Sequence, residues 1–405
     1  MSGPRTMQPA PAGPDFGAVH AALARQVSGA LLAGVASAVL RGRDLIDLHC
    51  TGLADREQGL PMQADTLCRA FSNTKLLTSC AVLLLWEEGR LGLDDPVEAW
   101  LPALGRPRVL RPGATTLEDT EPARGPITVR QLLSHTSGLG YGLLDPGTLL
   151  FRAYNERRVR SPHTTLAEMV DTLGTLPLAF HPGTDWAYSI ATDVLARLVE
   201  VVSGERFDRF LQSRITGPLG MVDTGFVVPE GQHHRLAAYY AGADPGDPLK
   251  PGLTRLDHAP HAGAYLRAFP RLSGGGGLVT TLHDMVALLR SLVPGGPTLL
   301  RPATLALMMS PQLPPGVWVQ FPESGPMPGK SFGLGGAVTV APSAQEPTAS
   351  AGEFEWGGMA GTHWWISPRT GLAGVLMTQR LMGFWHPYAF EFKRGVYAAA
   401  AGATP

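Results

Sequence analysis

Ser72 and Lys75 are the residues whose types and spacing most favour covalent chemistry in this chain. They stand three positions apart, so on a helix their side chains would share one face. Lysine is rare here, since Lys75, Lys250, Lys330 and Lys393 are the four lysines among 33 basic residues. A lysine can lose its proton on burial and act as a base, whereas arginine cannot. The pair indicates a serine nucleophile with its activator, and we expect the helix start and the apolar flank to favour neutral Lys75.

Tyr188 could supply a second proton-transfer group. It follows a Pro-Gly turn and precedes a helical stretch, where a phenol can point into a cleft and act beside a lysine as general acid and base. A third component is Trp356-Gly357-Gly358-Met359, in which two glycines would let another group approach the backbone closely. The backbone N–H of Met359, paired with that of Ser72, could then hold an oxyanion.

Each feature also has a purely structural explanation. Ser-x-x-Lys spacing occurs by chance in proteins of this size, with the lysine reaching solvent. A tyrosine before a helix often packs half-buried beneath it, and two glycines can form a strand-edge bulge. The Ser72-to-Lys75 segment is the one Ser-x-x-Lys in the chain, which favours the catalytic interpretation.

The three segments, in this order, resemble the serine β-lactamase and penicillin-binding-protein superfamily, which carries S-x-x-K, Y-x-N and K-T-G. The second motif here reads Tyr188-Ser189-Ile190 and the third reads Trp356-Gly357-Gly358. This combination resembles the family VIII carboxylesterases, the esterase B-like enzymes built on a class C β-lactamase fold. Residues 52–56, 132–139 and 274–277 share the resemblance, which therefore covers most of the chain.

The resemblance implies roles for these residues. Ser72 would be the nucleophile, Lys75 with Tyr188 would manage its proton, and the N–H groups of Ser72 and Met359 would form the oxyanion hole. No metal or organic cofactor is implied.

Two departures from the lactamase motifs bear on the substrate. Ile190 stands where lactamases use asparagine to hold a lactam side-chain amide, and Trp356 stands where they use lysine to bind a carboxylate. Both changes favour a neutral, apolar acyl group. We expect Trp356, Gly357, Gly358 and Ile190 to contact substrate, together with Tyr141 and His363, which could equally serve packing.

Other candidate motifs are weaker. Ser331 lies in a G-x-S-x-G pattern, but that motif needs a strand–turn–helix context that the surrounding prolines and the following strand do not offer. The adjacent Lys330 fits neither a phosphate loop nor the third motif. His258 and His261 are spaced as a metal pair without a convincing third ligand. His135 is expected to form hydrogen bonds in a loop rather than act as a base.

The elements that must position these groups predict an α/β fold. An antiparallel sheet flanked by helices would be built from both chain ends, with a mostly helical inserted lobe, as in β-lactamase/transpeptidase-like proteins. The runs 35–40 and 45–48 predict a hairpin, and 361–366 and 372–377 flank a second tight turn. Helices are expected at 129–134, 166–173, 191–203, 207–215, 282–292 and 390–401. The expected divisions are a flexible tail 1–16, an α/β lobe 17–70 and 270–405, and a helical lobe 71–269.

Composition limits the partners. The formal charge is −1 and the sequence has no run of basic residues. It therefore has no basic segment that would indicate binding to nucleic acid or anionic membranes. Cys50, Cys68 and Cys80 cannot all pair, which favours a reducing compartment, and no apolar stretch is long enough for a membrane span. We therefore expect a cytoplasmic enzyme whose partner is a small-molecule ester; its oligomeric state stays open.

The sequence thus predicts a serine carboxylesterase that cleaves short-chain, largely apolar esters through an acyl-enzyme, with weak or no β-lactamase activity. An acyltransferase, or an amidase or peptidase for small substrates, remains open because all share the acylation half-reaction. An alternative of another class is a catalytically silent protein that uses the cleft as a receptor.

Overall fold

An eight-stranded antiparallel sheet organises the computed structural model, which describes residues 9, 13–244, 246–256, 258–322, 324–383 and 386–402. The strands are β1 (Gly34–Arg41), β2 (Asp44–Asp55), β3 (Leu60–Pro61), β12 (Lys330–Phe332), β13 (Ala337–Thr339), β14 (Phe354–Gly357), β15 (His363–Ile366) and β16 (Leu372–Met377). Their order is β12-β13-β14-β15-β16-β1-β2-β3, so that β16 pairs with β1. The two ends of the chain therefore share one sheet, and the predicted fold class is confirmed.

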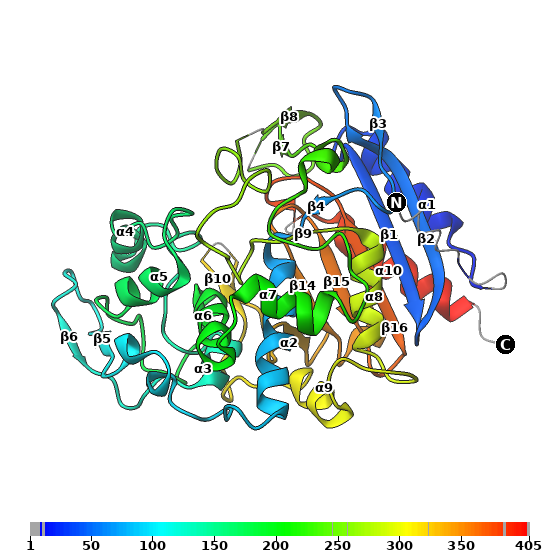
Figure 1. The fold of residues 1–405 in the computed structure, drawn as a ribbon. Coiled ribbons are helices and arrows are strands. Elements are labelled where there is room, and N and C mark those ends of the chain that lie inside the picture. The colour runs from blue at the N-terminus through cyan, green and yellow to red at the C-terminus, as the bar shows by residue number, and fades with distance from the viewer. Residues whose placement is uncertain are drawn as a thin grey trace.

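Helices cover both faces of this sheet (Figure 1). Helices α1 (Gly17–Ser28) and α10 (Tyr388–Gly402) pack together on one face, and α8 (Leu282–Ser291) covers the other. Strand β1 shows why both faces are filled: Val35 and Val39 join the cluster of α1 and α10, while Ala36 and Ala38 join the cluster of α2 (Thr74–Glu87) and α8. Alternate side chains of a strand point to opposite faces, so an apolar run supplies two cores.

Helices α3 to α6 gather on the far side of α2 from the strands β1 and β2 (Figure 1). Helix α6 lies at their centre, since it packs against α2, α3, α5 and α7. The bounds are α3 (Val129–Leu133), α4 (Leu149–Glu156), α5 (Leu166–Leu173), α6 (Ala191–Ser203), α7 (Phe207–Leu211) and α9 (Pro302–Met308). Short strands pair in this part and its borders: β4 (Cys68–Arg69), β5 (Arg108–Leu110), β6 (Thr120–Pro122), β7 (Tyr240–Gly242), β8 (Leu253–Arg255), β9 (Val279–Thr280), β10 (Gln320–Phe321) and β11 (Gly325–Pro326).

Several elements agree with the sequence predictions. Helices α5 and α6 have the predicted bounds, and the hairpin of β1 and β2 is present. The predicted helix 282–292 is observed as α8, whose first turn is capped by Thr281, which accepts a hydrogen bond from the Asp284 N–H. The predicted helix 207–215 is instead α7 followed by a π turn over Gln212–Thr216. Helices α1, α4 and α9 were not predicted.

The predicted lobe boundaries stay a prediction, although Phe16, the last residue of the predicted tail, is buried against α1 and α10. Residues 1–8 and 10–12 of that tail lie outside the described residues.

Three of the four lysines are buried. Lys75, Lys330 and Lys393 are 1%, 8% and 4% exposed, whereas Lys250 is exposed and pairs with Asp244. Cys50, Cys68 and Cys80 are all unpaired. Within the described residues, no helix has the length and apolar character required to cross a membrane.

Candidate active site

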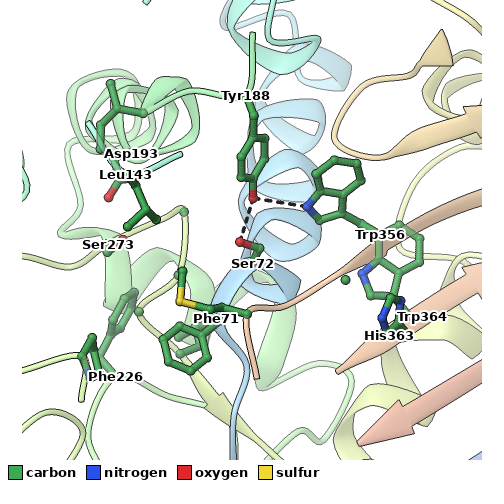
Figure 2. Close-up of a pocket in the computed structure, with 18 of the residues that line it drawn as sticks. Phe71, Ser72, Leu143, Tyr188, Asp193, Phe226, Ser273, Trp356, His363 and Trp364 are labelled. Atoms are coloured by element: carbon green, nitrogen blue, oxygen red, sulfur yellow. Dashed lines mark hydrogen bonds between the residues drawn. The ribbon is translucent and has the colours of Figure 1, made fainter. Parts of the chain in front are cut away.

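Ser72 lies in a 3-10 turn, Phe71–Asn73, that leads directly into α2. Phe71 has φ +44, in the left-handed region that a bulky residue rarely adopts. Such strain is typical of functional sites, because the surrounding structure must hold it in place. Here it turns the backbone so that Ser72 stands at the start of α2 with its hydroxyl toward Tyr188 (Figure 2).

Two groups donate hydrogen bonds to Ser72 Oγ. The Tyr188 hydroxyl lies 2.7 Å away and Lys75 Nζ lies 3.3 Å away. Lys75 Nζ also donates to the backbone O of Gly275 at 2.7 Å and lies 4.7 Å from the centre of the Tyr188 ring. The structure therefore brings the three predicted catalytic side chains into direct contact.

The expected neutral state of Lys75 is wrong for the resting protein. Burial lowers the pKa of its ammonium, but the phenols of Tyr141 and Tyr188 and the carboxylate of Asp193 act in the opposite direction. The net result is a pKa raised to about 12. Lys75 therefore enters the site as a cation, and its position at a helix start is outweighed by anionic and phenolic neighbours.

Tyr188 is fixed by aromatic side chains from several segments. The rings that surround it are His135, Tyr141, Trp186, Phe321 and Trp356. Of these, Trp356 also makes a polar contact, because its Nε1–H donates to the Tyr188 hydroxyl at 3.3 Å (Figure 2). The phenol oxygen thus lies between an indole donor and the serine hydroxyl.

The strand β14 and its following turn border Ser72. A Cβ added to Gly358 would lie 2.5 Å from the backbone O of Ala70 and 2.4 Å from Thr362 Oγ1. Glycine is therefore required for the close approach of this turn to the segment that carries the serine. The predicted oxyanion N–H of Met359 lies in the same turn, and its role stays a prediction.

A glycine-rich loop, residues 274–277, closes the opposite side of Lys75. A Cβ on Gly274 would lie 2.7 Å from Ala196 Cβ, and a Cβ on Gly275 would lie 2.5 Å from Asp193 Oδ2. The absence of side chains lets the loop pack against α6 and present the Gly275 carbonyl to Lys75.

A cavity of about 1780 Å³ opens onto Ser72 and Tyr188. Most predicted substrate contacts line it: Tyr141, Ile190, Trp356, Gly357 and His363. Gly358 does not, because it is buried in the turn described above. Ile190 is only 2% exposed, so it contributes to the apolar wall from beneath the surface.

His135 behaves as the predicted loop residue. It is buried beside Lys75, and both burial and that charge hold its pKa well below the usual value. Its Nδ1 accepts the backbone N–H of Ser189 at 3.2 Å, one residue after Tyr188. A neutral His135 therefore positions the Tyr188 segment.

The other candidate motifs contribute no group that contacts Ser72, although Lys330 and His261 line the same cavity. Ser331 lies inside strand β12, paired with Val338, and so lacks the strand–turn–helix context of an α/β-hydrolase nucleophile. Lys330 is buried and donates to Glu346 and Glu355. Among the described residues, His258 and His261 belong to no group that could hold a metal ion.

Sequence reasoning missed two features of the site. The hairpin of β10 and β11 contributes Phe321, and Gln320 Nε2 donates to the backbone O of Trp186 at 2.9 Å, which ties the hairpin to the Tyr188 segment. Asp193 lies near Lys75, one turn after Ile190 on α6. The sequence signal that could have identified Asp193 is its position as a charged residue among apolar residues of a predicted helix.

Comparisons with known proteins show the family and the fold. The family model described as Beta-lactamase matches residues 21–389. The chain is 33% identical to Esterase EstB of Burkholderia gladioli over 91% of each chain. It is 32% identical to the monacolin J acid methylbutanoyltransferase of Aspergillus terreus, over 79% of this chain and 78% of that one. The solved structure of EstCE1, titled a hydrolase with promiscuous acyltransferase activity, aligns with a TM-score of 0.78 at 29% identity, covering 94% of this chain and 97% of that one.

Proposed function

The chain belongs to the beta-lactamase family and is a serine hydrolase that acts on esters, and we propose that it hydrolyses esters of short, largely apolar acids through an acyl-enzyme on Ser72. The observation that carries the substrate class is the Trp356 indole, which donates to Tyr188 at 3.3 Å where a lactamase would present a lysine. A neutral side chain there offers a substrate carboxylate no charge partner. The silent-receptor alternative is set aside, since the relatives include enzymes such as Esterase EstB and a methylbutanoyltransferase.

The proton arrangement suggests how Ser72 is activated. Tyr188 and Lys75 both donate to Ser72 Oγ, so Ser72 can release its own proton only after one of these donors has lost a proton. In the reactive form, Lys75 and Tyr188 together have therefore lost one proton, and the remaining proton is shared between the Lys75 nitrogen and the Tyr188 oxygen. With the pKa of Lys75 raised to about 12, that proton stays on the ammonium, and the Tyr188 oxygen becomes the acceptor. The Trp356 N–H supports an anionic oxygen at this position.

Acylation then proceeds in two proton transfers. As Ser72 Oγ bonds to the ester carbonyl carbon, its proton passes to the Tyr188 oxygen and the carbonyl π pair moves to the carbonyl oxygen. The backbone N–H groups of Ser72 and Met359 stabilise that oxyanion in this proposal. When the tetrahedral intermediate collapses, the C–O bond to the alcohol breaks and Tyr188 returns the proton to the leaving oxygen.

Deacylation repeats the steps with water. The water oxygen attacks the acyl carbon while Tyr188 accepts a proton from that water. Tyr188 then protonates Ser72 Oγ as the acyl–serine bond breaks. Lys75 keeps its charge throughout and stabilises the negative oxygens by hydrogen bonding and by Coulomb attraction. Over the whole cycle each proton that Tyr188 accepts is returned, so the free enzyme is restored.

Acyl transfer is the second candidate, because a relative is a methylbutanoyltransferase and the solved EstCE1 structure is described with promiscuous acyltransferase activity. The cavity of about 1780 Å³ exceeds what a short acyl chain occupies, which leaves room for a bulky alcohol. Such an alcohol would serve equally as the leaving group of hydrolysis or as the acceptor of transfer.

A substrate panel tests the proposal. p-Nitrophenyl esters of rising acyl length are compared with a chromogenic cephalosporin, with Ser72→Ala as the blank. We expect the highest kcat/KM for acyl chains of roughly two to six carbons, and slow turnover or trapping by the cephalosporin. A cephalosporin that equals the best ester in kcat/KM would contradict the substrate assignment. Adding a competing alcohol and measuring ester product separates transfer from hydrolysis.

A further inference from the structure

Asp193 is a buried carboxylate that the mechanism above does not yet use. It is 2% exposed, borders the cavity (Figure 2), and lies on α6, three residues after Ile190. Its Oδ1 has no hydrogen-bond partner in the described part of the chain, and Arg271 Nη1 lies 3.9 Å away from it. A buried anion of this kind requires nearby positive charge to remain ionised.

The second oxygen of Asp193 faces the catalytic lysine across a glycine. A Cβ on Gly275 would lie 2.5 Å from Asp193 Oδ2 and 3.4 Å from Lys75 Nζ. The Asp193 carboxylate and the Lys75 ammonium therefore both lie close to the position that a Cβ at residue 275 would occupy, and a side chain there would lie between them. The two charges are therefore at most about 6 Å apart, a separation at which opposite charges in a partly buried site favour each other's charged form.

We propose that Asp193 is a positioning residue that keeps the Lys75 ammonium charged and aimed at Ser72, so that Tyr188 rather than Lys75 gives up the shared proton. This inference rests on the proposed function and adds the residue that decides where the proton stays. Gly275 is part of the same arrangement, because its lack of a side chain permits the approach.

Other ionisable groups border the same space and set the background. On the lysine side, Tyr141 and Tyr188 are phenols, and burial raises the pKa of Tyr141 to about 12, so it is uncharged at neutral pH. His135 is neutral because burial lowers its pKa. Two cations also act on these groups: Arg271 Nη1 lies 3.9 Å from Asp193 Oδ1, and the charge of Arg160 acts to lower the pKa of both Tyr141 and Arg271. Among the described residues, Asp193 is the carboxylate whose charge raises the pKa of Lys75.

The test is the pH dependence of kcat/KM for a short p-nitrophenyl ester in Asp193→Asn. A nearby negative charge opposes loss of a proton from the Lys75–Tyr188 pair, so its removal should move the acidic limb of the profile to lower pH by about one to two units. Asp193→Glu keeps the charge and should return the limb toward that of the wild type. Asp171→Asn, on the exposed face of α5, makes the same change away from the site and should not move it.

An acidic limb that stays in place in Asp193→Asn, or moves to higher pH, would overturn the proposal, whatever the loss of rate. Where Asp193→Asn does not fold, Asp193→Ser removes the charge and leaves room for water, and the same shift is expected. Fluorophosphonate labelling separates this proposal from the function itself. Turnover that persists in Ser72→Ala would refute the acyl-enzyme on Ser72, whereas an unmoved limb in an enzyme labelled on Ser72 refutes only the role of Asp193.

Discussion

Removing the Tyr188 hydroxyl should cost most of the catalysed rate without unfolding the protein. Tyr188→Phe keeps the ring among its aromatic neighbours but deletes the oxygen that lies 2.7 Å from Ser72 Oγ and accepts the Trp356 N–H. A positioned general acid–base contributes about 10²- to 10⁴-fold, or about 3–5 kcal/mol of transition-state stabilisation. Lys75→Met deletes the ammonium that donates to Ser72, and we expect a loss of similar size.

The double variant decides whether the two residues act as one unit. If a single proton is shared between them, Tyr188→Phe with Lys75→Met should be no more than about tenfold slower than the slower single variant. Independent groups would instead multiply their losses, to about 10⁴-fold or more. The assay is kcat/KM for a short p-nitrophenyl ester together with the burst of p-nitrophenol, and thermal unfolding confirms that each variant is folded. Multiplied losses would refute the shared-proton mechanism.

Three further expectations follow from the described residues. Ser72→Ala should abolish the burst and fluorophosphonate labelling, whereas Ser331→Ala, inside β12, should keep most turnover; a dead Ser331→Ala with an active Ser72→Ala would contradict the site. Burial lowers the pKa of His363 to about 4, so its neutral form stabilises the fold above its unfolded pKa near 6.5, and up to about 3 kcal/mol is lost as pH falls from 6.5 to 4. Urea unfolding should show a weaker decline in His363→Leu, and an unchanged pH slope would count against the assignment. Gly335→Ala places a Cβ 2.1 Å from Ser79 Oγ at φ +112 and should destabilise by roughly 2–4 kcal/mol in the same assay; a neutral effect would show that this contact relaxes easily.

Local sequence signals predicted the parts of the site that depend on short-range geometry. The spacing of Ser72 and Lys75 requires only one helical turn, and the position of Tyr188 before α6 follows from a turn and the start of a regular helix. The sheet could be predicted because short apolar runs flanked by turn residues occur at both ends of the chain.

What the sequence could not predict depends on contacts between distant segments. The pKa of Lys75 is raised by groups such as Asp193 that only the folded chain brings near it, so the local expectation of a neutral lysine failed. The contact of Trp356 with Tyr188 joins residues 168 positions apart, and residue type alone did not reveal that the indole donates to the phenol. The hairpin of β10 and β11 is too short to leave a clear pattern of its own.

The burial of three lysines gives the protein a surface with very few primary amines. An amine-directed reagent applied to the folded protein should modify the side chain of Lys250 and spare Lys75, Lys330 and Lys393. The spared lysines lie in two separate places, one in the active site and two in the ion-pair cluster of Glu346, Glu353 and Glu355. The order in which they become reactive during gentle denaturation would therefore show which of these two regions opens first, without any introduced probe.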